Sequence, residues 1–234
     1  MNHLFKLLYA ITVLSLVACS SSNTQEEAND QAEDNVSTVE EVAKPQEIES
    51  LINPNLASEE ELKSAGLNED LVVQVVQNRP FMSMTDFDTL LGDEVDNSEK
   101  EKLYTKLFIP FNLNTTPEDD FKLIPGVGDR MAHEFEEYRP YVKVEQFRKE
   151  IGKYVDESEV ARFEKYVFVP VELNTASQEE ILAIPGVGER MLHEFEEYRP
   201  YKSLEQFRKE IGKYVDDKEL SRLERFVYLS EQSE

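Results

Sequence analysis

Residue types that build most catalytic and metal sites are scarce in this chain. Its 234 residues include one cysteine, no tryptophan and three histidines, so an intramolecular disulfide is excluded. Only His133 and His193 lie beyond the first few residues, which is too few ligands for a zinc site of the usual cysteine and histidine kind. No nucleophile with a neighbouring base stands out. We therefore expect a protein that is not an enzyme and carries no resident cofactor.

Positive charge is also in short supply. Lys and Arg number 25 against 49 Asp and Glu, which gives a formal net charge of −24. That balance disfavours non-specific attraction to phosphate backbones and to anionic lipids. A nucleic-acid role would therefore depend on a local cluster of basic side chains.

The N-terminus lacks a hydrophobic run long enough to span a membrane. Leu7–Val17 is largely apolar, whereas a spanning helix needs roughly 20 such residues. The end of this run, Leu16-Val17-Ala18-Cys19, resembles the lipobox of bacterial lipoproteins. That resemblance implies a signal peptide at residues 1–18 and a lipid on Cys19. The alternative is an ordinary signal peptide with an incidental cysteine.

Residues 19–52 follow as an acidic linker rich in Ser, Asn, Gln, Glu and Asp. Such a composition buries too little apolar surface to offset chain entropy, so we expect a disordered tether, or else a segment that folds on a partner. The lipid would hold the protein in the cell envelope without crossing the membrane. In a Gram-negative envelope, the absence of Asp after the lipidated cysteine favours the outer membrane.

The rest of the chain repeats itself. Residues 130–156 and 190–216 match at 23 of 27 positions, at an offset of 60. A diverged first copy stays in register, since its Arg-Pro pair and a later glycine keep the same spacing. We infer three tandem repeats and expect the last two to fold without the first. Their predicted bounds are 53–110, 113–170 and 173–230.

Each repeat is predicted to hold about four short helices. In the third, Ser177 and Glu180 form a capping box that opens one helix. Apolar residues at helical spacing mark a second helix at about 189–198. Ser203 and Asp216 are suited to cap two more. No segment alternates like a strand, so the predicted fold class is all-α.

The residues around the first turn of the third repeat resemble a known family. They are the lead Asn174-Thr175-Ala176-Ser177, the turn Ile184-Pro185-Gly186-Val187-Gly188 and the later Tyr198-Arg199-Pro200-Tyr201. Together they resemble the helix-hairpin-helix domain of the competence protein ComEA, and the second repeat carries the same turn at 124–128. ComEA-like proteins are exported, held at the membrane and bind double-stranded DNA during uptake. The resemblance therefore implies duplex DNA as partner and a role in competence.

The hairpin offers a physical reason to bind phosphate. Glycines allow a tight turn and a close approach to a ligand, and we expect both to serve the turn. The helix that follows begins with unpaired N–H groups and the positive end of its dipole. The resemblance implies sequence-independent contacts to DNA phosphates, sometimes with a monovalent cation at the hairpin. The implied contact residues are Pro125, Gly126, Val127, Gly128 and Arg130, with Pro185, Gly186, Val187, Gly188 and Arg190.

Some departures from the family pattern disfavour DNA binding. The first repeat has Ala65-Gly66-Leu67-Asn68 in place of the hairpin, and the family's second hairpin is reduced to Gly-Lys-Tyr at 152–154 and 212–214. Asp129 and Glu189 place negative charge at the helix starts. The alternative is a protein-interaction or envelope scaffold module that has lost DNA binding. Small extrinsic proteins of photosystem II resemble ComEA and bind protein, so fold does not decide function.

Overall fold

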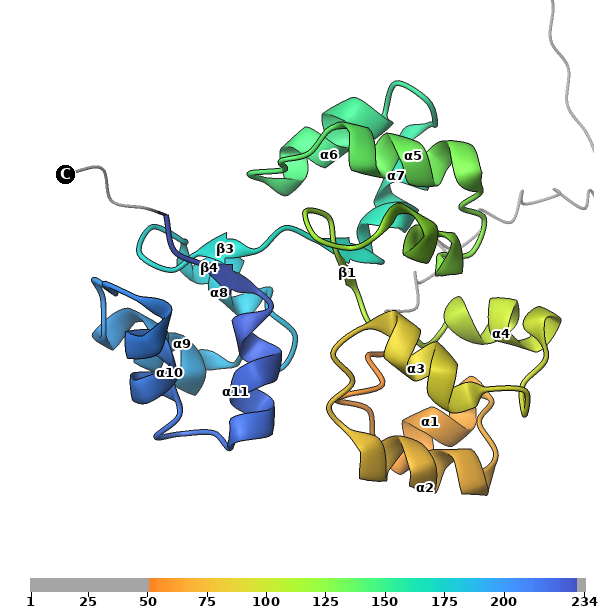
Figure 1. Cartoon of the computed structure of the whole chain (residues 1–234), viewed down its shortest axis with the longest axis horizontal. Coiled ribbons are helices and arrows are strands. Elements are labelled where there is room, and N and C mark those ends of the chain that lie inside the picture. Colours follow the sequence, from red (N-terminus) through yellow and green to blue (C-terminus); the bar gives the residue numbers. More distant parts are fainter. Residues whose placement is uncertain (1–50, 231–234) are drawn as a thin grey trace, which may run out of the picture. The chain divides into compact units, whose positions relative to one another are not determined.

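The computed structural model describes residues 51–230, which are mostly helical. Within this range the chain forms eleven α-helices, one 3-10 helix and four two-residue strands (Figure 1). The predicted signal peptide, Cys19 and nearly all of the predicted linker lie outside the described residues. The linker boundary at residue 52 needs correction, because Ile52 forms a parallel bridge with Leu107 and its N–H donates to Lys106 O at 2.8 Å. The folded part therefore includes Leu51 and Ile52.

We refer to residues 51–110, 111–170 and 171–230 as the first, second and third segments. The first contains α1 (Glu59–Ala65), α2 (Glu69–Asn78), α3 (Met84–Leu91) and α4 (Asn97–Tyr104). The second contains β1 (Phe111–Asn112), η1 (Glu118–Leu123), α5 (Asp129–Glu137), α6 (Val144–Ile151), α7 (Glu157–Glu164) and β2 (Val167–Phe168). The third contains β3 (Val171–Glu172), α8 (Gln178–Leu182), α9 (Glu189–Glu197), α10 (Leu204–Ile211), α11 (Asp217–Glu224) and β4 (Val227–Tyr228).

Short polar side chains begin most of these helices. Ser177 and Glu180 form the predicted capping box at α8. Ser203 and Asp216 accept hydrogen bonds from backbone N–H groups in the first turns of α10 and α11. Each such cap stabilises a helix by about 1 kcal/mol. The predicted helix starts in the third segment are therefore confirmed by the observed bonds.

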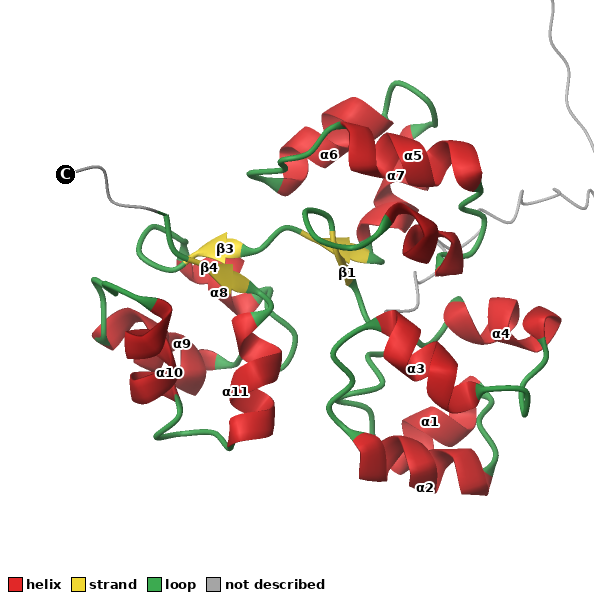
Figure 2. Cartoon of the chain, viewed as in Figure 1, coloured by secondary structure: helices red, strands yellow, loops and turns green. Residues whose placement is uncertain are grey.

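The four short strands depart from the all-α prediction. β1 pairs in parallel with β2, and β3 pairs in parallel with β4 (Figure 2). Each pair joins the first residues of a segment to its last, as the Ile52–Leu107 bridge does in the first segment. A strand of two residues is too short to show the alternation that marks strands in a sequence, which is why sequence analysis missed them.

The buried apolar side chains form two separate cores. One core runs through the first and second segments, and the other belongs to the third segment apart from Phe168 at its edge. Phe108, at the end of the first segment, packs edge-to-face on Phe111 and Tyr166 of the second, with ring centroids 5.3 and 4.8 Å apart. Removing the first segment would expose these two rings. The shared core therefore speaks against the expectation that the second segment folds without the first.

Candidate functional site

The hairpin of the second segment is a four-residue turn between η1 and α5. The N–H of Val127 donates to Ile124 O at 2.9 Å, and Gly126 has a φ of 80°. Pro125 followed by a glycine with positive φ is the pattern of a type II turn. The third segment has the same turn, with a φ of 83° at Gly186. A side chain is strained at this φ, so the first glycine of each hairpin is required by the turn.

The second glycine of each hairpin has no such role, contrary to the expectation that both serve the turn. Gly128 and Gly188 are the N-caps of α5 and α9, with φ of −99° and −110°. Other residues readily adopt these angles. A Cβ built at either position would meet no atom within 4 Å. These glycines therefore keep open space beside the start of each helix.

Among the residues that the structure describes, no side chain accepts from the backbone N–H groups at the starts of α5 and α9. In the first segment the position that matches Gly128 and Gly188 is Asn68, and its Oδ1 accepts from Leu71 N at 2.9 Å. The chain thus satisfies the start of α2 itself. By contrast, α5 and α9 present unpaired donors and the positive end of the helix dipole to solvent. An anionic oxygen fits this arrangement.

Side chains of both signs surround the two open helix starts. Arg130 and Arg190 are exposed. Asp129 is 2.6 Å from Lys122 Nζ, and the hydrogen bond from that ammonium lowers the pKa of Asp129. In the third segment leucine replaces this lysine, so Glu189 lacks the matching partner. Each helix start therefore carries one exposed arginine and one carboxylate. Only in the second segment does a lysine form an ion pair with that carboxylate.

The structure brings the predicted contact residues together at one helix start in each segment. Three of these residues are exposed in each segment, namely Gly126, Gly128 and Arg130 in the second and Gly186, Gly188 and Arg190 in the third. The side chains of Val127 and Val187 are buried. These two valines can therefore offer a ligand only their backbone groups.

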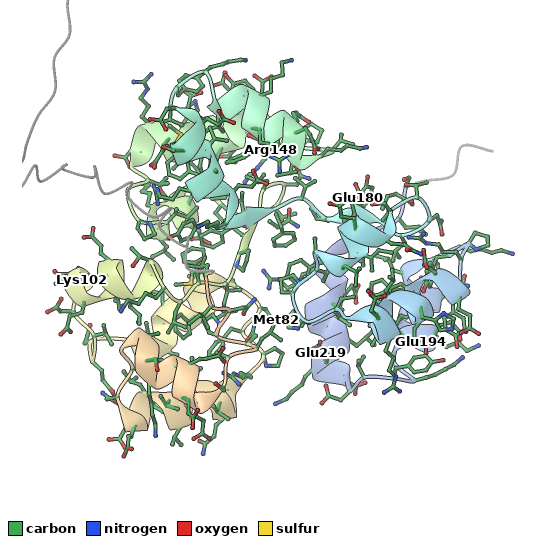
Figure 3. The ribbon with its side chains drawn as sticks, turned by 180° about the vertical axis from the view of Figure 1, so that it is seen from behind. Met82, Lys102, Arg148, Glu180, Glu194 and Glu219 are labelled. Carbon is green, nitrogen blue, oxygen red and sulfur yellow. The ribbon has the colours of Figure 1, made fainter. Side chains whose placement is uncertain are left out.

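Sequence analysis missed an arginine beneath each hairpin. Arg162 Nη2 lies 3.1 Å from the position that a Cβ on Gly126 would occupy, and Arg222 Nη2 lies 2.8 Å from the same point on Gly186. Arg222 Nε also donates to Glu219 Oε2 at 2.7 Å. Glu219 lies on α11 and is labelled in Figure 3. The side chain of Arg162 is 32% exposed, whereas that of Arg222 is 2% exposed. The one sequence signal for these buried or half-buried arginines is the glutamate three residues before each of them.

The side chains of the Gly-Lys-Tyr loops at 152–154 and 212–214 are engaged within the protein. Lys153 pairs with Glu150 and lies 4.9 Å from the ring centroid of Tyr138. The hydroxyls of Tyr138 and Tyr154 are 2.6 Å apart. Lys213 makes the equivalent contacts in the third segment. Asp156 and Asp216 cap α7 and α11, the helices that follow these loops, so neither of these two helix starts is open to a ligand.

Other motif residues hold the fold rather than face a ligand. The side-chain amide of Asn174 donates to Tyr201 O at 3.0 Å and accepts from Tyr201 N at 2.7 Å. Arg199 donates to Leu173 O and Ala176 O at 2.6 and 2.8 Å. The second segment repeats these contacts. The Asn-Thr-Ala-Ser stretch and the Tyr-Arg-Pro-Tyr stretch therefore have structural roles.

No protein family, curated protein or solved structure that was compared matches this chain. The resemblance to ComEA thus rests on the motif residues alone. Among residues 51–230, no helix combines the length and the apolar character needed to cross a membrane.

Proposed function

We propose that this protein is a lipid-anchored, ComEA-like helix-hairpin-helix protein with three tandem repeats. In this proposal it binds duplex DNA through its phosphates, without reading sequence, in the cell envelope during DNA uptake. The observation that carries the proposal is the contrast at one position of each repeat. Asn68 caps its own helix, whereas Gly128 and Gly188 leave theirs uncapped and open. Two phosphate sites per chain follow from this contrast.

The charge of the protein limits the strength of such binding. Most non-specific affinity comes from the counterions that basic side chains release on contact with phosphate. Here Arg130 and Arg190 are the exposed arginines at the two helix starts, within a chain of net charge −24. We therefore expect a dissociation constant of about 10⁻⁴ to 10⁻⁶ M, weakening as salt rises from ~50 to ~200 mM.

Replacing both open glycines by asparagine tests the proposal. Gly128→Asn and Gly188→Asn copy the first segment, so each new amide should occupy the donors that a phosphate would use. The backbone angles at both positions accept the change, and asparagine is a good N-cap. Fluorescence anisotropy with a short labelled duplex should show binding by the wild type and its loss in the double variant. Ser203→Asn, which changes one cap for another at α10, is the matched control and should bind like the wild type.

A protein-interaction or envelope scaffold role is the second candidate. It is favoured by the carboxylates of Asp129 and Glu189 at the first positions of α5 and α9. If the wild type shows no duplex affinity at ~50 mM salt, where electrostatic binding should persist, the DNA proposal is wrong and this one stands. The lipid anchor has its own test, since the wild type should fractionate with membranes and Cys19→Ser should block lipidation and processing. Mass spectrometry that finds an unlipidated mature N-terminus at another residue would contradict lipid anchoring.

A further inference from the structure

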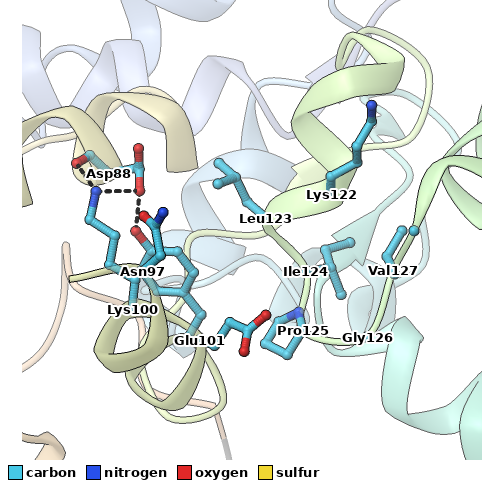
Figure 4. Close-up of a pocket in the computed structure, with 12 residues that line it drawn as sticks. Asp88, Asn97, Lys100, Glu101, Lys122, Leu123, Ile124, Pro125, Gly126 and Val127 are labelled. Atoms are coloured by element: carbon cyan, nitrogen blue, oxygen red, sulfur yellow. Dashed lines mark hydrogen bonds and ion pairs between the residues drawn. The ribbon is translucent and has the colours of Figure 1, made fainter. Parts of the chain in front are cut away.

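The hairpin of the second segment borders a pocket of about 410 Å³ (Figure 4). One wall is the stretch from Lys122 to Gly128, and the other comes from α3 and α4 of the first segment. The two segments share one core, and Thr85 Oγ1 of α3 donates to Asp120 Oδ2 of η1 at 3.0 Å. The shared core and this hydrogen bond hold the second wall opposite the hairpin.

The wall opposite the hairpin carries one carboxylate without a counter-ion. Asp88 is neutralised by Lys100, whose Nζ lies 3.0 Å away, and it also accepts from the Tyr104 hydroxyl. Glu101 is exposed and, among the residues that the structure describes, has no ion pair within 4 Å. Figure 4 shows its carboxylate directed toward Pro125. A phosphate at this hairpin would therefore approach a negative charge across the pocket.

From this placement we propose that Glu101 is a specificity-determining residue that weakens anion binding at the second segment's hairpin. The proposal rests on the proposed function and adds that the two hairpins are unequal. Like charges placed across a pocket repel, and the low-dielectric walls reduce screening of that repulsion. The positions that match Glu101 in α7 and α11 are Ala161 and Ser221, so the sequence does not repeat this acid. At the hairpin of the third segment the opposing carboxylate is instead Glu189, where leucine replaces the matching lysine.

Glu101→Gln, measured in two backgrounds, tests the proposal. With Gly188→Asn, binding depends on the hairpin beside Glu101, and removal of the charge should raise duplex affinity roughly fivefold. With Gly128→Asn that hairpin is closed, so the same change should have little effect. Glu60→Gln on α1 removes an equal charge from a residue outside the pocket lining, and it should change affinity little in either background. Thermal melting by circular dichroism checks that each variant is folded.

The two proposals fail in different ways. Equal gains from Glu101→Gln in both backgrounds would show a general charge effect and overturn the role of Glu101, while leaving duplex binding intact. An affinity unchanged by Glu101→Gln in the Gly188→Asn background would overturn it as well. Absence of duplex binding in the wild type and in every variant would overturn both proposals together. A gain confined to the Gly188→Asn background would support both.

Discussion

The second and third segments have nearly the same sequence through their central helices but different surroundings. Residues 130–156 and 190–216 match at 23 of 27 positions, and their hairpin turns have φ values of 80° and 83° at the first glycine. Yet the arginine beneath the hairpin is 32% exposed in one and 2% exposed in the other. Local sequence thus determines the turn and the caps, whereas burial depends on what each segment packs against.

Neighbouring residues account for much of this difference. A Cδ atom of Leu56 lies 3.1 Å from the position that a Cβ on Gly186 would occupy, beside Arg222. At Gly126, Arg162 is the one described residue within 4 Å of the equivalent Cβ position. The second segment instead shares its core with the first through Phe108. Two similar sequences can therefore differ in stability and in ligand access.

The largest expected effect comes from the aromatic residues that end the first and second segments. Phe108 is buried in the shared core, whereas Phe168, its counterpart 60 residues later, is only half-buried against Phe226. Phe108→Ala should lower the free energy of unfolding by about 3–5 kcal/mol. Phe168→Ala should lower it by about 1–2 kcal/mol, because less apolar surface is lost. Urea unfolding followed by circular dichroism measures both, and equal losses would contradict the difference between the two junctions.

A smaller effect is expected at the arginines beneath the hairpins. Glu219→Gln removes the partner of the buried Arg222, and we expect a loss of about 2 kcal/mol, below the figure for a fully buried pair because Glu219 is itself 34% exposed. Glu159→Gln in the second segment should cost under about 1 kcal/mol, because Arg162 can turn to solvent. Thermal melting compares the two.

Arg222→Met is the control for this comparison. Arg222→Met removes the buried member of the pair and leaves Glu219, which is 34% exposed and can be solvated, so the loss should be smaller than that from Glu219→Gln. If Glu219→Gln and Glu159→Gln cost the same, the difference in burial has no energetic consequence. If Arg222→Met costs as much as Glu219→Gln, the arginine contributes through packing rather than through its charge.

Sequence analysis predicted the helices and the hairpins better than it predicted what surrounds them. Ser177 with Glu180 and the Pro-Gly turns are local signals, since every participating residue lies within a few positions of its partner. The parallel pairs of two-residue strands join residues more than 50 positions apart, and no local pattern marks them. Asparagine is a common N-cap, so the sequence is compatible with the capping role of Asn68 at α2. Its contrast with Gly128 became informative only once the structure showed that glycine is not needed there.

The residues of the candidate site could be predicted from the sequence, but the side chains that other helices place around them could not. Pro125 to Arg130 were identified from a motif, and the structure places them at one helix start. The approach of Arg162 and Glu101 to this hairpin depends on how α4 and α7 pack, and pairs so distant in sequence carry no periodic signal. Lys153 is basic, but Glu150 and the ring of Tyr138 engage its ammonium. Packing therefore decides which charges a ligand would meet.

The smallest expected effect concerns a histidine whose partner differs between the two segments. His133 Nδ1 lies 3.1 Å from Glu118 Oε2, and this carboxylate raises the pKa of His133 above its ordinary value of 6.5. In the third segment glutamine replaces Glu118, and the nearest carboxylate to His193 belongs to Glu197, at 3.6 Å. Because the folded-state pKa of His133 is raised, its stabilising effect is fully present below pH 6.5 and fades as pH rises through the raised value. Both groups are exposed, so the effect on overall stability should be slight. NMR titration should show the pKa of His133 falling toward 6.5 in Glu118→Gln, and an unchanged value would mean that the ion pair does not form in solution.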